Sequence, residues 1–219
     1  SFLQETPNNL FEDKQKQTHP VEDQEIKSLD EITEIKDLIP FILNHNSPLR
    51  KNTKNMALFD GNIKSQLMII GEAPGKEEDE QGLPFVGSAG QLLNKMLSAI
   101  QLERKDIYIT NTIPWKLSQN RTPTDQEILE FLPFLQRQIE IIKPKIIYLL
   151  GTTAAKAILS TPLSLDTLRA KWHDYNSINM DTSVKVLVSY HPSTLLQSPK
   201  LKKEAWVDLQ MLQKELNEN

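Results

Sequence analysis

Four short runs of apolar and β-branched residues alternate in this chain with longer segments that have helical periodicity. The runs cover residues 66–70, 106–110, 145–150 and 184–189. Strands that alternate with helices usually form a parallel sheet, because each helix returns the chain to the edge where the previous strand began. We therefore predict an α/β fold, a three-layer α/β/α sandwich around a four-stranded, mostly parallel sheet.

Helix signals occupy the intervals between these runs. Ser88 can cap a helix that reaches about residue 100, and Thr124 with Glu127 has the spacing of a capping box at the start of a helix that ends at residue 142. Further helices are predicted over 151–159 and from Ser198 to about residue 216. Residues 29–43 predict a helix that is interrupted near Pro40.

Composition limits the possible chemistry. The 219 residues include no cysteine, which excludes disulfides, thiolate metal sites and cysteine nucleophiles. Residues 1–39 carry ten acidic and four basic side chains, and the rest of the chain is close to neutral. DNA binding would therefore need a local basic face. We expect residues 1–40 to be a flexible acidic extension, partly helical near its end, and residues 41–219 to form one domain.

The sequence predicts a cytoplasmic protein with no membrane partner. No apolar run has the length of a membrane span, and residues 1–40 are too polar and acidic for a signal peptide.

Chemically useful residues follow directly on the predicted strands. Gly71 and Glu72 follow the first strand, Asn111 the second and His191 the fourth, and six of the seven glycines lie between residues 61 and 90. Ligands of parallel sheets bind just beyond the carboxyl ends of the strands. The pattern thus predicts a site built from a glycine loop, a carboxylate, an amide and an imidazole.

Each motif also has a plainer interpretation. The segment GEAPGK is one residue short of a phosphate-binding loop, and residues 77–80 are more easily interpreted as a solvated acidic loop than as a metal site. Glu72 could brace its loop by accepting backbone N–H bonds. Phe85 could be a stacking platform or a core residue, and His45 and His173 are assigned to the surface.

Five longer motifs, in order, carry a resemblance to a known family. They are GEAPGKEEDEQGLPFVGSAGQLL, YITNTIPWK, NRTPTDQEI, KPKIIYLLG and SYHPSTLLQSPKLKKEAWVDLQML, and the match spans about residues 44–212. The chain resembles the family 4 uracil-DNA glycosylases. The resemblance implies that it flips uracil out of DNA and hydrolyses the N-glycosidic bond, leaving an abasic site.

The resemblance also implies roles for particular residues. Phe85 would stack on the flipped uracil, Asn111 would bind its polar edge, and the backbone of Gly71 and Ala73 would line the pocket. His191 would stabilise the departing uracil anion, and Glu72 would position water. A loop after the histidine would contact DNA, through Ser193, Thr194, Leu195, Leu196 and Lys200.

One feature departs from the family pattern. Relatives hold a [4Fe–4S] cluster through four cysteines, whereas the matching positions here are Asn44, Ser47, Trp115 and Phe131. We therefore expect no cluster, no other bound metal or cofactor, and apolar packing around Trp115 and Phe131 instead.

Two further expectations complete this interpretation. A related branch captures its abasic product covalently through a histidine in an arginine-rich insertion, which residues 116–124 lack, so covalent capture is not expected. We expect a monofunctional glycosylase without lyase activity, and a monomer. Residues 1–40 could bind a protein partner. The alternative is a catalytically degenerate homologue that acts as a DNA- or protein-binding module.

Overall fold

The computed structural model describes residues 28–218, and its centre is a six-stranded sheet. The strand order is β1-β3-β2-β4-β6-β5. The strands are β1 (Phe59–Gly61), β2 (Leu67–Gly71), β3 (Tyr108–Asn111), β4 (Ile146–Leu150), β5 (Trp172–Tyr175) and β6 (Val184–Ser189). The predicted α/β class is confirmed, but the predicted strand number is wrong.

The two additional strands are the antiparallel edges of the sheet. β1 pairs antiparallel with β3 and β5 pairs antiparallel with β6, whereas the four central strands β3, β2, β4 and β6 are parallel to one another. Both edge strands are short, and most of their residues are only partly buried. They therefore lack the continuous apolar run of a buried strand. His173, expected on a surface loop, lies in β5, and its Nε2 is 2.8 Å from the carbonyl oxygen of Leu168.

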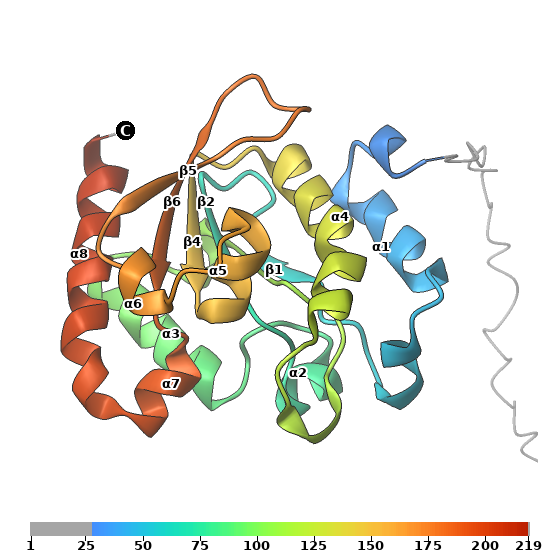
Figure 1. Cartoon of the computed structure of the whole chain (residues 1–219), viewed down its shortest axis with the longest axis horizontal. Coiled ribbons are helices and arrows are strands. Elements are labelled where there is room, and N and C mark those ends of the chain that lie inside the picture. The colour runs from blue at the N-terminus through green and yellow to red at the C-terminus, as the bar shows by residue number, and fades with distance from the viewer. Residues whose placement is uncertain (1–27, 219) are drawn as a thin grey trace, which may run out of the picture.

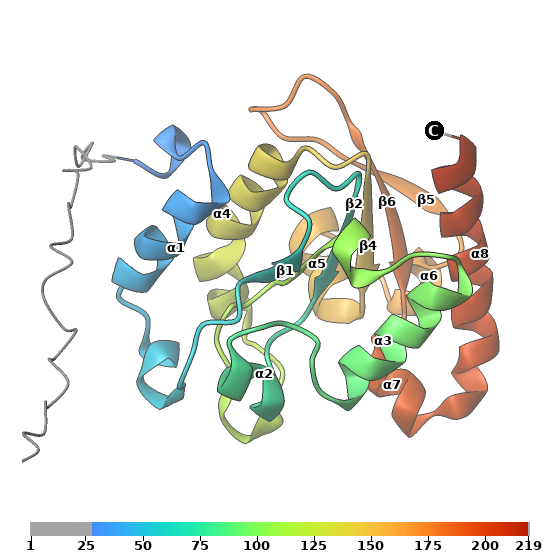
Figure 2. The ribbon, with the colours of Figure 1, turned by 180° about the vertical axis from the view of Figure 1, so that it is seen from behind.

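Helices cover both faces of the sheet (Figures 1 and 2). They are α1 (Ile35–Asn44), α2 (Lys76–Gln81), α3 (Ser88–Ala99), α4 (Asp125–Ile142), α5 (Thr152–Leu159), α6 (Leu165–Leu168), α7 (Pro192–Gln197) and α8 (Lys202–Glu218). Alternate residues of β2 point to opposite layers. Met68 and Ile70 pack in the cluster that includes α4 and α5, and Leu67 and Ile69 pack with α3 and α8. The three-layer prediction is confirmed.

Several helix boundaries differ from the sequence expectation. α1 continues through Pro40, and Leu38 and Ile42, on either side of the proline, are both fully buried. The final helix begins at Lys202, after a separate 3₁₀ turn (Pro199–Leu201). Two short helices, α2 and α7, occupy segments expected to be loop or turn.

The described chain starts to pack on the domain at its N-terminal end. Ile32 is fully buried, and its carbonyl oxygen accepts a 2.7 Å hydrogen bond from Nε of Arg137 in α4. The remainder of the predicted acidic extension, residues 1–27, lies outside the described residues. Within residues 28–218, none of the helices has the length and apolar character of a membrane span.

Candidate active site

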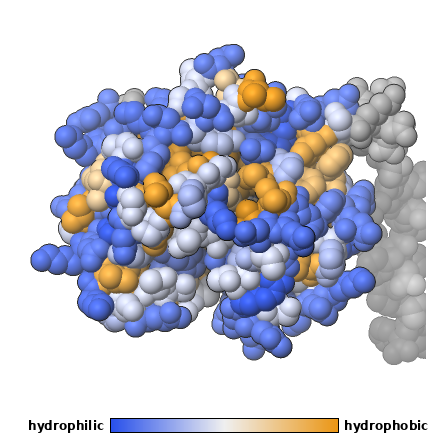
Figure 3. All heavy atoms as spheres, viewed as in Figure 1, coloured by the Kyte–Doolittle hydropathy of each residue, from blue (hydrophilic) through white to orange (hydrophobic). Residues whose placement is uncertain are grey.

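The ends of the parallel strands meet at a cleft of about 910 Å³. Its walls include Glu72 and Ala73 after β2, Asn111 at the end of β3, and His191 after β6. Phe85, Ser193 and Thr194 also line it. The cleft opens between α2 and α7, where the surface in Figure 3 is notched. The structure therefore brings together residues that the sequence separates by more than a hundred positions.

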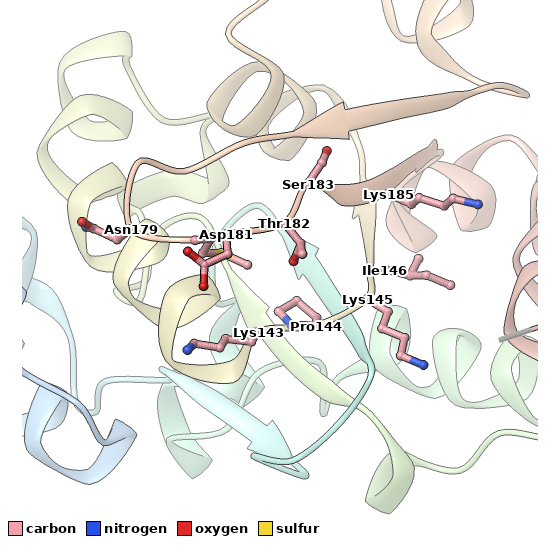
Figure 4. Close-up of a pocket in the computed structure, with 10 residues that line it drawn as sticks. Lys143, Pro144, Lys145, Ile146, Asn179, Asp181, Thr182, Ser183 and Lys185 are labelled. Atoms are coloured by element: carbon pink, nitrogen blue, oxygen red, sulfur yellow. The ribbon is translucent and has the colours of Figure 1, made fainter.

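A second, smaller hollow lies at the opposite end of the sheet (Figure 4). It measures about 380 Å³ and is bordered by Lys143, Lys145 and Lys185 near the starts of β4 and β6, and by the loop that contains Asp181. None of the site residues predicted from sequence lines it. The cleft at the carboxyl ends of the strands is therefore the candidate active site.

Asn111 supplies a buried side-chain amide with an unused hydrogen-bond acceptor. It lies directly beside Gly71 in the parallel register of β2 and β3, and it is 4% exposed. Its Oδ1 atom has no hydrogen-bond partner within the protein. A buried amide oxygen without a partner is costly, at about 1–3 kcal/mol, so this atom is suited to a ligand that donates a hydrogen bond.

Gly71 has no side chain, and this lets Phe85 and Asn111 approach its backbone closely in the cleft. A Cβ atom at this position would lie 2.4 Å from Cζ of Phe85 and 2.5 Å from Oδ1 of Asn111. The glycine is thus required for a close approach of other side chains, rather than for an unusual backbone angle.

Phe85 lies in the cleft on a constrained loop. Its side chain is 4% exposed, its ring centroid is 5.5 Å from that of His191, and its backbone has a left-handed φ of +54°. Such a conformation costs a non-glycine residue on the order of 1–3 kcal/mol, so surrounding contacts must hold it. Phe85 combines burial with a position on the cleft wall, so the two interpretations offered by its sequence are compatible.

Glu78 provides part of that support, and the sequence interpretation of the acidic run is wrong. Residues 77–80 belong to α2, where Glu78 and Asp79 are buried. Glu78 Oε1 accepts hydrogen bonds of 2.8 Å from the backbone N–H groups of Val86 and Gly87, and Oε2 accepts one of 3.1 Å from Gly75. This carboxylate therefore ties the loop that bears Phe85 to α2.

His191 is held in a single orientation at the start of α7. Its Nδ1 accepts the backbone N–H of Ser193 at 3.2 Å and lies 2.7 Å from the Ser193 hydroxyl oxygen. Burial lowers the pKa of His191 to about 4, and the nearby carboxylate of Glu78 opposes part of this shift. The imidazole is therefore neutral at pH 7. Because Nδ1 accepts, the proton is on Nε2, which is left as a donor.

Glu72 reaches the cleft between β2 and α5. Its carboxylate accepts a hydrogen bond from the hydroxyl of Thr153, and its carbonyl oxygen accepts the backbone N–H of Ile113 at 3.0 Å. The loop-bracing role weighed for Glu72 is performed by Glu78. Thr153 and Glu78 escaped sequence reasoning, because nothing in their local pattern indicates which carboxylate or loop they contact.

The predicted DNA-contacting residues occupy different environments. Leu195 is 1% exposed and packs with Tyr190 and Ala205, whereas Leu196 is 43% exposed. Ser193 binds His191, and Lys200 is exposed on the turn after α7. Of the two leucines, only Leu196 presents an apolar side chain to solvent.

The four positions that match cluster ligands do not fit an iron–sulfur cluster, because none supplies a thiolate. Trp115 and Phe131 are buried in an apolar cluster, Ser47 caps a 3₁₀ turn, and Asn44 is exposed at the end of α1. His45 packs edge-on against Phe131 with ring centroids 6.0 Å apart. Within residues 28–218, no group of three or more acidic or histidine side chains is arranged to hold a metal.

His45 is more constrained than its predicted surface position implied. Its Nε2 lies 3.0 Å from Oε1 of Glu130, and its ring also contacts Phe134, with centroids 5.2 Å apart. The imidazole, directly after α1, therefore packs on α4 through two aromatic rings and one carboxylate.

Comparison with known proteins agrees with this geometry. The family model described as the uracil DNA glycosylase superfamily matches residues 58–210. A type-4 uracil-DNA glycosylase of Pyrobaculum aerophilum is 40% identical over 168 residues, which make up 75% of this chain and 85% of that protein. A type-4 uracil-DNA glycosylase of Archaeoglobus fulgidus is 40% identical over 158 residues, 71% of this chain and 79% of that protein.

A third relative is of a different type and comes from the same organism as the first. A type-5 uracil-DNA glycosylase of Pyrobaculum aerophilum is 28% identical over 150 residues, 62% of this chain and 64% of that protein. The identity to the type-4 protein of the same organism is higher, in agreement with the motifs. The chain belongs to the uracil DNA glycosylase superfamily.

Proposed function

We propose that this protein is a uracil-DNA glycosylase that flips uracil out of DNA and hydrolyses its N-glycosidic bond. The observation that carries the proposal is the unpartnered Oδ1 of Asn111, buried in the same cleft as the neutral imidazole of His191. An acceptor and a donor fixed in one pocket complement a base that presents both N–H and carbonyl groups.

Base recognition would depend on Phe85 and Asn111. The flipped base stacks on the ring of Phe85, and its N3–H donates to Oδ1 of Asn111. Cytosine has no proton at N3 in its neutral form and would leave this buried oxygen unpaired, which costs about 1–3 kcal/mol. The backbone of Gly71 and Ala73 lines the same wall and keeps it close to the base.

Bond cleavage would depend on His191 and Glu72. As the bond breaks, negative charge develops on the uracil oxygen, and the Nε2–H of His191 donates to it. One preorganised donor of this kind contributes about 10²–10³ in rate. The carboxylate of Glu72, oriented by Thr153, favours the cationic sugar and positions the attacking water. The reaction ends in an abasic site, and the strand remains intact until alkali is added.

DNA would be held by the segment that follows His191. Leu196 is the proposed wedge in the space that the base vacates, because it is exposed whereas Leu195 is part of the core. Ser193, Thr194 and Lys200 are proposed to contact phosphate groups.

We also propose that the aromatic packing around Trp115 and Phe131 replaces the family's iron–sulfur cluster. The support is chemical, because the four matching positions supply no thiolate and two of them are buried aromatic rings. Anaerobically purified protein should contain no stoichiometric iron and should lack the broad visible absorption of a cluster. Iron in proportion to protein would contradict this part of the proposal.

The activity is tested with a single uracil in a labelled oligonucleotide, followed by alkaline cleavage. Wild-type protein should produce the nicked strand, and His191→Ala and Asn111→Ala should each lower the single-turnover rate by about 10² or more. His173→Ala, which changes a histidine outside the cleft, is the control and should retain activity. A wild type that binds the oligonucleotide without releasing uracil would instead favour the degenerate binding module.

A further inference from the structure

The backbone around Phe85 is the most constrained part of the cleft. Phe85 has a left-handed φ of +54°, and its backbone is flanked by two carbonyl groups, that of Pro84 and its own. α3 then packs closely on one of them, since a Cβ atom at Gly90 would lie only 1.8 Å from the Phe85 oxygen. A bulky residue in this conformation persists only where neighbouring groups fix it.

Arg104 contacts both of these carbonyl groups. Its Nη2 donates to the oxygen of Pro84 at 2.5 Å, and its Nη1 donates to the oxygen of Phe85 at 2.8 Å. Nη1 also lies 3.3 Å from Oδ1 of Asn94 in α3. The planar guanidinium therefore spans the peptide units before and after Phe85, which a single ammonium group could not match in geometry.

The guanidinium is itself anchored away from the cleft. Its Nε donates to Oδ2 of Asp60 in β1 at 2.7 Å, and Oδ1 of the same carboxylate accepts the backbone N–H of Gly61 at 2.8 Å. Arg104 is part of the 3₁₀ turn (Arg104–Asp106) that precedes β3. The edge of the sheet and the Phe85 loop are thus connected through one side chain.

Glu78 holds the other side of the same loop. It accepts the N–H groups of Val86 and Gly87, whereas Arg104 donates to the carbonyl groups of Pro84 and Phe85. One backbone polar group in each of residues 84–87 is therefore fixed by one of two charged side chains of opposite sign. Because the backbone on both sides of Phe85 is fixed, its ring has little freedom to move along the pocket.

We infer that Arg104 is a positioning residue, which holds the ring of Phe85 at the height where a flipped base stacks. This role rests on the proposed function, since it requires that Phe85 stack on uracil. Arg104 does not line the cleft, so it acts on the base only through Phe85. Loss of Arg104 should weaken base binding and slow uracil excision as long as the Phe85 ring is present. It should have little effect on either once that ring is removed.

The test is a double-mutant cycle in the full chain with Arg104→Gln, Phe85→Ala and their combination. The measurements are the single-turnover rate on a uracil oligonucleotide and the inhibition constant of free uracil, which reports the base pocket without DNA. Arg104→Gln should worsen both by about tenfold. In the Phe85→Ala background, the same change should alter them by no more than about twofold.

Arg137→Gln is the matched control for lost stability. Arg137 also bridges two carbonyl oxygens, those of Asp30 and Ile32, and pairs with Glu140, but it lies outside the cleft. The Arg137→Gln variant should lower the thermal midpoint to a similar degree as Arg104→Gln. It should leave the rate and the inhibition constant within about twofold of wild type. Arg104→Lys, which keeps the charge but not the fork, should fall between Arg104→Gln and wild type.

The possible outcomes separate the two proposals. The positioning role alone is overturned if the wild type is active and Arg104→Gln changes the rate and the inhibition constant no more than Arg137→Gln does. It is also overturned if Arg104→Gln changes them by the same factor with and without the Phe85 ring. A wild type that neither releases uracil nor is inhibited by it overturns the proposed function and this role together. If Arg104→Gln does not fold, Arg104→Lys is used in the same cycle, and equal losses in both backgrounds again overturn the role.

Discussion

Replacing Gly71 by alanine should disable the base pocket, although it adds only one methyl group. The new Cβ would lie 2.4 Å from Cζ of Phe85 and 2.5 Å from Oδ1 of Asn111. Nonbonded carbon atoms pack at about 3.5–4.0 Å, so at least one of these groups must move by about 1 Å. Both belong to the proposed uracil pocket, and the perturbation therefore acts on base binding directly.

Neither group can move without disturbing other contacts. The Phe85 loop is fixed by Arg104 and Glu78, and Asn111 is paired beside Gly71 in the sheet. Overpacking of this kind costs about 1–3 kcal/mol in the free energy of unfolding. A displacement of about 1 Å in a positioning group can lower the rate by about 10². We therefore expect a large kinetic effect with a modest loss of stability.

The assay is single-turnover release of uracil at a temperature where each variant is folded, together with urea unfolding. Gly82→Ala is the control, because its φ of +70° strains alanine while its nearest new contact, Cβ of Asn55, is 3.4 Å away. That variant should lose about 1 kcal/mol in stability and keep its rate. If Gly71→Ala excises uracil as fast as Gly82→Ala, the crowding deduced at Gly71 does not govern the pocket.

Three further outcomes are expected. The excision rate should show no titration of His191 between about pH 5.5 and 7.5. Burial lowers the pKa of this imidazole from 6.5 to about 4, so it stays neutral throughout that range. A step in the wild-type rate near pH 6.5 would refute this expectation. Phe131→Ala should lower the free energy of unfolding by about 3–5 kcal/mol in urea, since the ring is 1% exposed, whereas Leu129→Ala, 65% exposed, should cost little. Asn111→Asp should lower the uracil-to-cytosine rate ratio, and an unchanged ratio would remove Asn111 from base recognition.

The layered fold was predictable because long, buried elements carry periodic patterns. The central strands read as continuous apolar runs, and the capping box of Thr124 and Glu127 forms as expected at the start of α4. β1 and β5 were missed because edge strands are short and need no apolar run. The aromatic cluster could be anticipated from Trp115 and Phe131, but not the contribution of His45, which depends on the meeting of α1 and α4.

The same division applies to the cleft. Glu72, Asn111 and His191 could be placed together from sequence, because parallel strands bring their carboxyl ends to one edge. The acidic run of residues 77–80 was misassigned, because its composition is that of a solvated loop. In the structure Glu78 is buried, and it accepts hydrogen bonds from backbone groups up to nine residues away.

The family, the layered architecture and the residue types available for chemistry could all be deduced from the amino-acid sequence, because local patterns and motif order carry them. How those residues are held follows only from contacts between elements that are distant in the chain. The Nε2–H tautomer of His191 follows from the hydrogen bond that its Nδ1 accepts from Ser193, the exposure of Leu196 from the packing of Leu195, and the hydrogen bond to the Phe85 carbonyl group from Arg104, nineteen residues further along the chain. These properties depend on distances between atoms that sequence separation does not encode.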